Sequence, residues 1–468
     1  MKKLTNFILD SYLKIIFIII TATSSFSSCE QFLDLNEPTN QISSNIIFSD
    51  KRLALAAISD LYANLRTNTL LNGGLYGSGS LLGCYTDELT SVTASSLDFK
   101  TFFDLGIVPT TPAIDNIWIN AFKQIYAVNK IIEGLENSNA YIDEVSRKQM
   151  LGEALAIRGV LHFYLTNIYG AIPYITSTDY HQNRNASKFP TTEIYKKTQT
   201  DWETADNILV SEYPAADRTR INKSAVNLLL ARLHLYQKNW AKAKDYAQVV
   251  IQNSMYNTEN DISKVFLKDS KSTIWQFTSV DTGYNTMEGQ YYIFIALPPS
   301  NVVLSDNLMN SFEASDLRKS MWTKTLSNAT MSYTHPYKYK QNTKTSASLE
   351  YSVVLRVEEA YLILAESLNE MNDTAIALNY LNKIRIRAGL SPISIISQSQ
   401  FRNELENERR HEFFTEFGHR FFDLKRWNRL DNVIHNLKPS WQSYMGILPI
   451  PQRELLANPL LNPQNNGY

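Results

Sequence analysis

Two stretches of the chain repeat one spacing of small residues, and this repeat limits the possible folds more than any other feature. Ala231 is followed twelve positions later by Ala243, and Ala365 is followed twelve positions later by Ala377, each time across a turn near an asparagine. Small residues at this spacing let two antiparallel helices approach closely. The apolar pattern continues after each pair at Ala247, Val250, Leu381 and Ile384.

This spacing is the packing pattern of tetratricopeptide helical hairpins. Any helix pair contains some small residues, so one match is weak, whereas two in one chain indicate a repeated unit. The two hairpins are far apart in the sequence, so we expect helix pairs that support one scaffold and not a regular solenoid.

Further helices are indicated by apolar residues at helical spacing. The periodicity starts near Leu53, and a strong helix begins near Ile114. The next helix covers about 148–169 and ends at Gly170, and its partner starts at Thr192 as N-cap. The chain is therefore predicted to be mainly α.

Two regions interrupt this pattern and are rich in loop residues. The first has several glycines, and the second contains strand-like runs at 274–277 and 291–295. Such insertions on a rigid scaffold often carry function. We expect one domain over 29–468, with a helical scaffold over about 40–66, 114–253 and 351–468 and insertions over about 67–113 and 254–350.

The N-terminus is typical of an export signal, because Lys2 and Lys3 precede an apolar run at 15–20 that is too short to span a membrane. Small residues then lead to Cys29, which predicts a lipoprotein signal over 1–28 and acylation of that thiol. The alternative is ordinary secretory cleavage. Phe26 favours this alternative, because a lipoprotein signal usually has leucine at that position. If Cys29 is acylated, no disulfide forms, and Cys84, in an apolar stretch, is a buried unreactive thiol.

The composition of the chain limits the classes of ligand and partner that it can bind. The formal net charge is −1 with no basic run, which disfavours a nucleic-acid partner. Two cysteines cannot build a structural zinc site, and we expect no metal or cofactor. Aromatic residues make up 12% of the chain and include 26 tyrosines, which suit a wet surface that holds rings.

No catalytic motif stands out. Residues 77–83 depart from the spacing of a phosphate loop and are interpreted as loop glycines. The adjacent Asp87 and Glu88 point in different directions, so a solvated or capping role is expected for them. The protein is therefore predicted not to be an enzyme. A surface glycoside hydrolase is the alternative, because its two carboxylates can lie far apart in the sequence.

The densest group of charges lies at 408–427. Glu408, Glu412 and Glu416 recur every four residues. No nucleophile or ligand set accompanies them, so we predict a partly buried ion-pair network that fixes helix packing, and not a catalytic site. The other members expected to pair there are Arg409, Arg420, Asp423 and Arg426.

Several segments together resemble the SusD/RagB family of outer-membrane nutrient-binding lipoproteins of Bacteroidetes. They are CEQFLD at 29–34, EALAIRG at 153–159 running to YGAIPY at 169–174, LRVEEAY at 355–361 with NKIRIRAGL at 382–390, ERR at 408–410 through DLKRW at 423–427, and LPIP at 448–451. The resemblance implies four tetratricopeptide-like helix pairs that support an irregular ligand-facing half. It also implies a SusC-like TonB-dependent transporter as partner, a surface location on the outer membrane, and a glycan or, less often, a peptide as cargo.

The family motifs transfer no binding residues, so the ligand site is predicted from aromatic residues of the insertions. Aromatic faces cover the C–H patches of sugars while neighbouring polar groups hold the hydroxyls. At least one ring from each insertion should face a shared groove, whereas Trp275 should pack its own strand. The candidates are Tyr76, Phe102 and Phe103 in the first insertion and Tyr284, Tyr291, Tyr292 and Trp322 in the second.

Overall fold

The computed structural model describes residues 44–92, 96–138, 142–394 and 396–468. The chain divides into two compact units, Met1–Ile47 and Phe48–Tyr468. Within the first unit the described part is the short helix α2 (Ser44–Ile47), and Cys29 with the predicted signal lies outside the described residues. None of the described helices is both long and apolar enough to cross a membrane.

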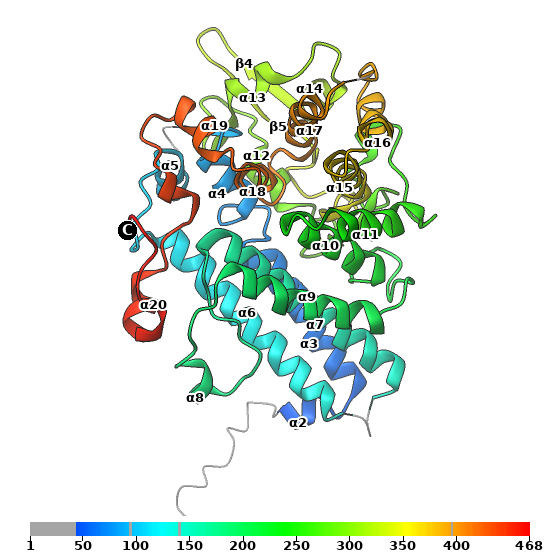
Figure 1. Cartoon of the computed structure of the whole chain (residues 1–468), viewed down its shortest axis with the longest axis vertical. Coiled ribbons are helices and arrows are strands. Elements are labelled where there is room, and N and C mark those ends of the chain that lie inside the picture. The colour runs from blue at the N-terminus through cyan, green and yellow to red at the C-terminus, as the bar shows by residue number, and fades with distance from the viewer. Residues whose placement is uncertain (1–43, 93–95, 139–141, 395) are drawn as a thin grey trace, which may run out of the picture. The chain divides into compact units, whose positions relative to one another are not determined.

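The first layer of the second unit consists of long helices that pack side by side (Figure 1). They are α3 (Lys51–Asn68), α6 (Pro112–Glu136), α7 (Glu144–Tyr169) and α9 (Thr191–Ile208). Helices α7 and α9 approach closely because Gly159 leaves room for Trp202, whose indole Nε1 donates to the Ala156 carbonyl at 3.0 Å. Helix α7 ends at Gly170 as predicted, with φ +73°. Helix α9 begins at Thr191 after Pro190, so the predicted N-cap at Thr192 is wrong.

Both predicted hairpins are present. The first pairs α10 (Lys223–Tyr236) with α11 (Trp240–Gln252), and the second pairs α15 (Val357–Glu370) with α16 (Thr374–Arg387). Helix α11 packs on α15, so the hairpins stack on each other although about a hundred residues separate them (Figure 1). The four alanines of the repeat are completely buried, which confirms the packing logic: Ala231, Ala243, Ala365 and Ala377.

The C-terminal part adds shorter helices to this scaffold. Helix α17 (Gln398–Phe413) starts with a capping box formed by Ser397 and Gln400 and packs against α15 and α16. It is followed by α18 (His419–Arg426), α19 (Leu430–Leu437) and α20 (Gln452–Ala457). The remaining short helices are α4 (Ser78–Tyr85), α5 (Leu97–Phe103), α8 (Tyr180–Asn183), α12 (Met287–Tyr292), α13 (Asp306–Ser311), α14 (Leu317–Met321), η2 (Ile262–Lys264), η3 (Ser443–Gly446) and η4 (Pro459–Leu461).

Within the described residues, strands form three two-stranded antiparallel sheets. In the first, β1 (Leu89–Ser91) pairs with β3 (Val302–Leu304), with Leu89 opposite Leu304. The others pair β2 (Thr273–Phe277) with β6 (Ser352–Arg356), and β4 (Thr323–Ser327) with β5 (Ser332–Pro336). Since β1 belongs to the first insertion and β3 to the second, their ladder joins two regions about two hundred residues apart in sequence.

Two local predictions in the insertions are wrong. The run at 291–295 is not a strand, because Thr286 caps helix α12 by accepting from the Gly289 N–H, and the chain leaves the helix after Tyr292. The glycines at 77–83 belong largely to helix α4. A Cβ at Gly79 would lie 2.3 Å from the Thr415 carbonyl oxygen, so this glycine permits close packing against a distant segment.

Two buried side chains in the same regions match their predictions. Trp275 lies on β2, is completely buried and packs edge-on against Tyr62 at 6.2 Å between ring centroids. Cys84 is also completely buried, and burial raises the pKa of its thiol to about 12. A thiol that stays protonated at neutral pH is a poor nucleophile, so Cys84 is a packing residue.

Candidate functional site

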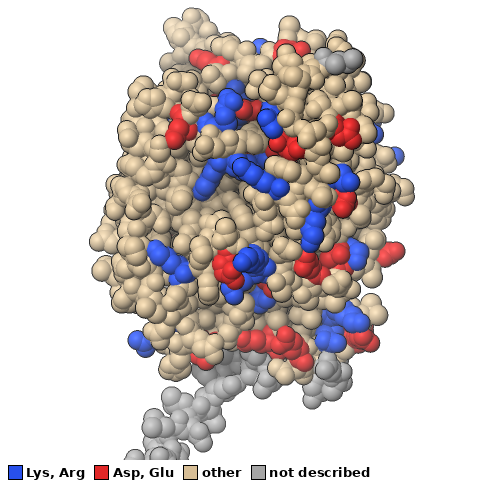
Figure 2. Space-filling view, in the orientation of Figure 1, with Lys and Arg blue, Asp and Glu red and all other residues tan. Residues whose placement is uncertain are grey.

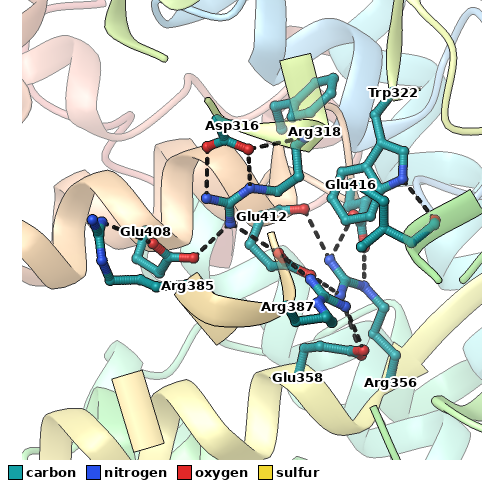
Figure 3. A network of polar contacts seen from close by, with 12 residues as sticks. Asp316, Arg318, Trp322, Arg356, Glu358, Arg385, Arg387, Glu408, Glu412 and Glu416 are labelled. Carbon is teal, nitrogen blue, oxygen red and sulfur yellow. Dashed lines mark hydrogen bonds and ion pairs between the residues drawn. The ribbon is translucent and has the colours of Figure 1, made fainter. Parts of the chain in front are cut away.

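The charged C-terminal cluster forms a buried network of ion pairs (Figure 3). Glu412 on α17 accepts from Arg387 on α16, with both carboxylate oxygens 2.6 Å from Nη2. It also pairs with Arg356 at the end of β6 and with Arg318 on α14 at 3.0 Å. Burial raises the pKa of Glu412, but Arg387, Arg356 and Arg318 outweigh it and hold that pKa well below its usual range. One carboxylate therefore ties three separate elements to α17.

Asp423 and Arg420, two further members predicted for this cluster, also form buried ion pairs. Asp423 accepts from Arg409 at 2.7 Å and from Arg426 at 2.8 Å. Arg420 donates two hydrogen bonds to Asp87, at 2.9 and 2.8 Å. The prediction of a structural ion-pair network is confirmed. Among the described residues no group of His, Cys, Asp or Glu is arranged to hold a metal ion.

The predicted solvated role of Asp87 and Glu88 is wrong, because both side chains are buried. Asp87 is neutralised by Arg420 and also lies 3.0 Å from Arg410. Glu88 Oε2 accepts from the Thr415 N–H at 3.2 Å. Burial, and to a smaller extent the negative charge of Asp87, raises the pKa of Glu88 to about 8. These carboxyls serve packing between the first insertion and the C-terminal helices.

Three of the seven aromatic candidates are core residues, and their prediction as ligand contacts is wrong. Trp322 is completely buried against Phe266, and its Nε1 donates to a backbone carbonyl at 2.9 Å. Phe102 is completely buried against Tyr85, and Tyr292 is 5% exposed. Helix α5, helix α12 and the α14–β4 segment turn Phe102, Tyr292 and Trp322 inward, respectively.

Four candidates keep exposed surface. Phe103 is half-buried, with its ring 4.5 Å from Lys438 Nζ. Tyr76 and Tyr291 are half-buried, and Tyr284 is 37% exposed.

Tyr76 and Tyr291 bring the two insertions together. The ring of Tyr291 lies against Gly74, where an added Cβ would be 2.7 Å from a ring carbon. Tyr76 hydrogen-bonds to Asp98, and burial together with that carboxylate raises the tyrosine pKa, with a smaller contribution from Tyr291. Tyr76 and Tyr291 are therefore neighbours from the two insertions, and a groove shared by one ring from each insertion stays a prediction.

A cavity of about 120 Å³, formed mainly by the second insertion, includes Tyr284 in its lining. Gly73, which precedes the glycine under Tyr291, lines the same cavity. Its other lining residues are Arg66, Thr278, Val280, Asn285, Thr286, Met287, Glu288, Gln290 and Ser352.

Glu288 is the chemically distinctive residue of this cavity. Its side chain is 8% exposed, its Oε1 accepts from the Ser352 hydroxyl, and its Oε2 has no hydrogen-bond partner among the described residues. Burial raises the pKa of Glu288 to about 7, although the Ser352 hydroxyl opposes the shift. A carboxyl poised near neutrality can accept a hydrogen bond or, when protonated, donate one.

Arg66 supplies the opposite chemistry at the same cavity. Its Nη1 donates to the carbonyls of Thr278 and Ser279, each at 2.9 Å, while its Nε has no partner in the described parts of the chain. The lining of the cavity therefore combines a guanidinium, a carboxyl group and a partly exposed aromatic ring. Sequence reasoning missed both charged residues. Glu288 stands beside the Tyr291–Tyr292 pair, which was a usable signal, whereas nothing in the sequence marked Arg66.

The fold defines a helical-repeat protein. Its two insertions meet at Tyr76 and Tyr291 and carry a polar cavity lined by Tyr284. The chain belongs to the SusD family: the SusD family model matches residues 177–468. A second model, described as starch-binding associating with outer membrane, matches residues 31–235.

Individual relatives agree with this assignment. The SusD-like protein P25 of Formosa agariphila is 25% identical, and the alignment covers 94% of this chain and 97% of the relative. A SusD superfamily protein of Bacteroides vulgatus superposes with a TM-score of 0.79 at 21% identity, covering 90% of this chain and 99% of that one. A laminarin-binding SusD-like protein superposes with a TM-score of 0.74 at 21% identity, covering 90% and 100%. The family resemblance and the helical fold class predicted from sequence are confirmed.

Proposed function

We propose that the protein is a cell-surface lipoprotein of the outer membrane that binds a glycan without cleaving it and delivers it to a SusC-like TonB-dependent transporter. The observation that carries the glycan assignment is the cavity lined by the Tyr284 ring together with one carboxyl group, Glu288, and one guanidinium, Arg66. Family membership and the laminarin-binding relative support the same choice.

The chemistry of a sugar fits this arrangement. A pyranose presents apolar C–H patches, which a tyrosine face removes from water, and hydroxyls that need both donors and acceptors. Tyr76 and Tyr291 offer ring surface outside the cavity, and Tyr284 offers it at the lining. Glu288 can accept from a hydroxyl and Arg66 can donate to one.

A peptide ligand and glycoside hydrolysis are the competing functions. Hydrolysis of a glycosidic bond uses a pair of carboxyl groups, whereas the lining of this cavity contains one, Glu288. A peptide would use the same donors and acceptors, so the ligand class is decided by binding measurements.

The test is titration calorimetry of Tyr284→Ala and Tyr291→Ala against laminarin, other polysaccharides and a peptide panel. We expect each variant to bind the cognate glycan about tenfold more weakly, equivalent to about 1.4 kcal/mol. The melting temperature should be unchanged, because these rings keep exposed surface. Tyr126→Ala is the matched control, since this tyrosine is 49% exposed on helix α6, outside the insertions.

Three results would contradict the proposal. Unchanged affinity in both variants would place the site elsewhere, and binding restricted to peptides would change the ligand class. Release of reducing ends from the bound glycan would indicate a hydrolase. Delivery is tested separately, by co-purification of a large outer-membrane barrel with the affinity-tagged chain.

A further inference from the structure

A second concave surface lies on the helical scaffold, apart from the cavity at the insertions. It is a groove of about 630 Å³, within the range of about 300–1,000 Å³ that is typical of ligand sites. Figure 2 shows Lys and Arg side chains around a hollow on the face where α10, α15, α17 and α18 meet in Figure 1. The groove is lined by Leu235, Lys238, Trp240, Glu366, Glu370, Ser399, Arg402, Asn403, Leu405, Glu406, Arg426, Trp427 and Arg429.

Two half-buried tryptophans contribute to this groove. Trp427 is fixed in place, because its Nε1 donates to Glu366 at 2.7 Å and the Arg426 guanidinium lies 4.3 Å from its ring centre. Trp240 is the first residue of α11, and no hydrogen bond holds its indole N–H to another residue of the described chain. The groove therefore offers one rigid indole and one indole whose polar edge is available.

Each carboxylate of the groove is paired with at least one arginine. Both oxygens of Glu366 accept from Arg426. Both oxygens of Glu370 accept from Arg402, at 2.6 and 2.7 Å. Glu406 lies 3.2 Å from Arg420 and 3.7 Å from Arg429 through its two oxygens. The negative charges of the groove are therefore compensated within the protein.

The cations, in contrast, keep unused donors. Arg402 engages Glu370 through Nε and Nη2, which leaves Nη1 without a partner among the described residues. The Arg429 side chain is 42% exposed, and its Nη2 lies 3.7 Å from Glu406, beyond hydrogen-bond distance. Lys238 is exposed and forms no ion pair with a described residue. Four cations face three carboxylates in this lining, so the groove has a surplus of positive charge and of free N–H groups.

We propose that this groove is a second binding site, for a sugar unit that carries an acid group such as a carboxylate or a sulfate. Either acid is an anionic acceptor at neutral pH, which matches a groove that has free cationic donors and carboxylates already paired with arginines. The indoles of Trp240 and Trp427 cover the C–H surface of the ring. A neutral sugar fits less well, because it carries no negative charge to balance the surplus cation of the lining.

The experiment measures binding of three probes to the folded mature chain by titration calorimetry. The probes are an oligogalacturonate, a sulfated galacto-oligosaccharide and a neutral laminari-oligosaccharide, with poly-glutamate as an anion that lacks sugar rings. We expect at least one acidic sugar to bind and to weaken as salt is raised from about 0.05 to 0.5 M. Trp240→Ala should weaken it at least tenfold, and Trp240→Phe by less than about threefold, since phenylalanine keeps an aromatic face.

Charge is tested with a matched pair. Lys238→Gln should weaken the acidic sugar about threefold or more, whereas Lys244→Gln, which removes the same charge from helix α11 outside the groove, should not. Tyr284→Ala should leave acidic-sugar binding intact, so failure at the insertion site is distinguishable from failure here. The inference is overturned if neither acidic sugar binds, if poly-glutamate binds as tightly as they do, or if Trp240→Ala has no effect.

Discussion

Replacement of Asp423 by alanine should destabilise the protein strongly without acting on ligand binding. Asp423 is 3% exposed and neutralises Arg409, which is 2% exposed, at 2.7 Å. Arg426 keeps both oxygens of Glu366 after the substitution, but no other carboxylate of the described chain pairs with Arg409. The variant therefore leaves one guanidinium buried without a counter-ion.

The magnitude follows from that stranded charge. Breaking a buried pair by removing one partner costs about 3–5 kcal/mol. Unfolding entropy is about 2.1 cal/mol/K per residue, so the roughly 420 residues of Phe48–Tyr468 give about 0.9 kcal/mol/K. The expected fall in melting temperature is therefore about 3–6 °C. This is a modest shift in temperature for a large change in free energy, because the unit is large.

Calorimetric melting and urea unfolding would measure both quantities. Lys148→Ala is the control, since it removes an exposed pair with Glu144 on α7 that is worth about 0.3–0.5 kcal/mol. The double variant Arg409→Leu, Asp423→Leu should recover part of the loss, because neither charge of that pair remains buried alone. If Asp423→Ala melts within 1 °C of wild type while glycan binding is lost, the cluster is a ligand site and the reasoning is refuted.

Two further predictions concern the anchor and the pH dependence. Cys29→Ala should abolish labelling by a fatty-acid probe in cells, and equal labelling of variant and wild type would exclude acylation at that residue. Burial raises the folded-state pKa of Glu88 to about 8, so its contribution to stability is fully present below the unfolded pKa near 4.5 and is lost as pH rises through 8. The melting temperature of Glu88→Gln should therefore fall less than that of the wild type when the pH is raised from 5.5 to 8.5. An equal fall in both proteins would contradict this prediction.

The helical scaffold could be predicted because its signals are local. The alanines at 231, 243, 365 and 377 mark close helix packing through spacing alone, and all four are buried. Gly170 ends helix α7 because its positive φ is a property of one residue. The error at 291–295 arose because residue composition alone favoured a strand there. Helix α12, which starts after its N-cap Thr286, extends into that run.

The candidate site could be predicted only in part, because exposure of a ring depends on segments remote in sequence. Trp322 is buried by Phe266, and Tyr291 keeps exposed surface beside Gly74. Nothing within either local sequence distinguishes these outcomes. Arg66 is at the cavity because helix α3 ends near β2, a contact between residues more than two hundred positions apart.

The ion pair between Asp87 and Arg420 has a consequence for the order in which the molecule takes shape. The carboxylate is synthesised 333 residues before its guanidinium. The second partner of Asp87, Arg410, is also synthesised late. A nascent chain that closed earlier would bury the Asp87 carboxylate unpaired, at a cost of about 3–5 kcal/mol. Closure of the scaffold must therefore wait for the last sixty residues, and products that end earlier are left as open substrates for proteolysis.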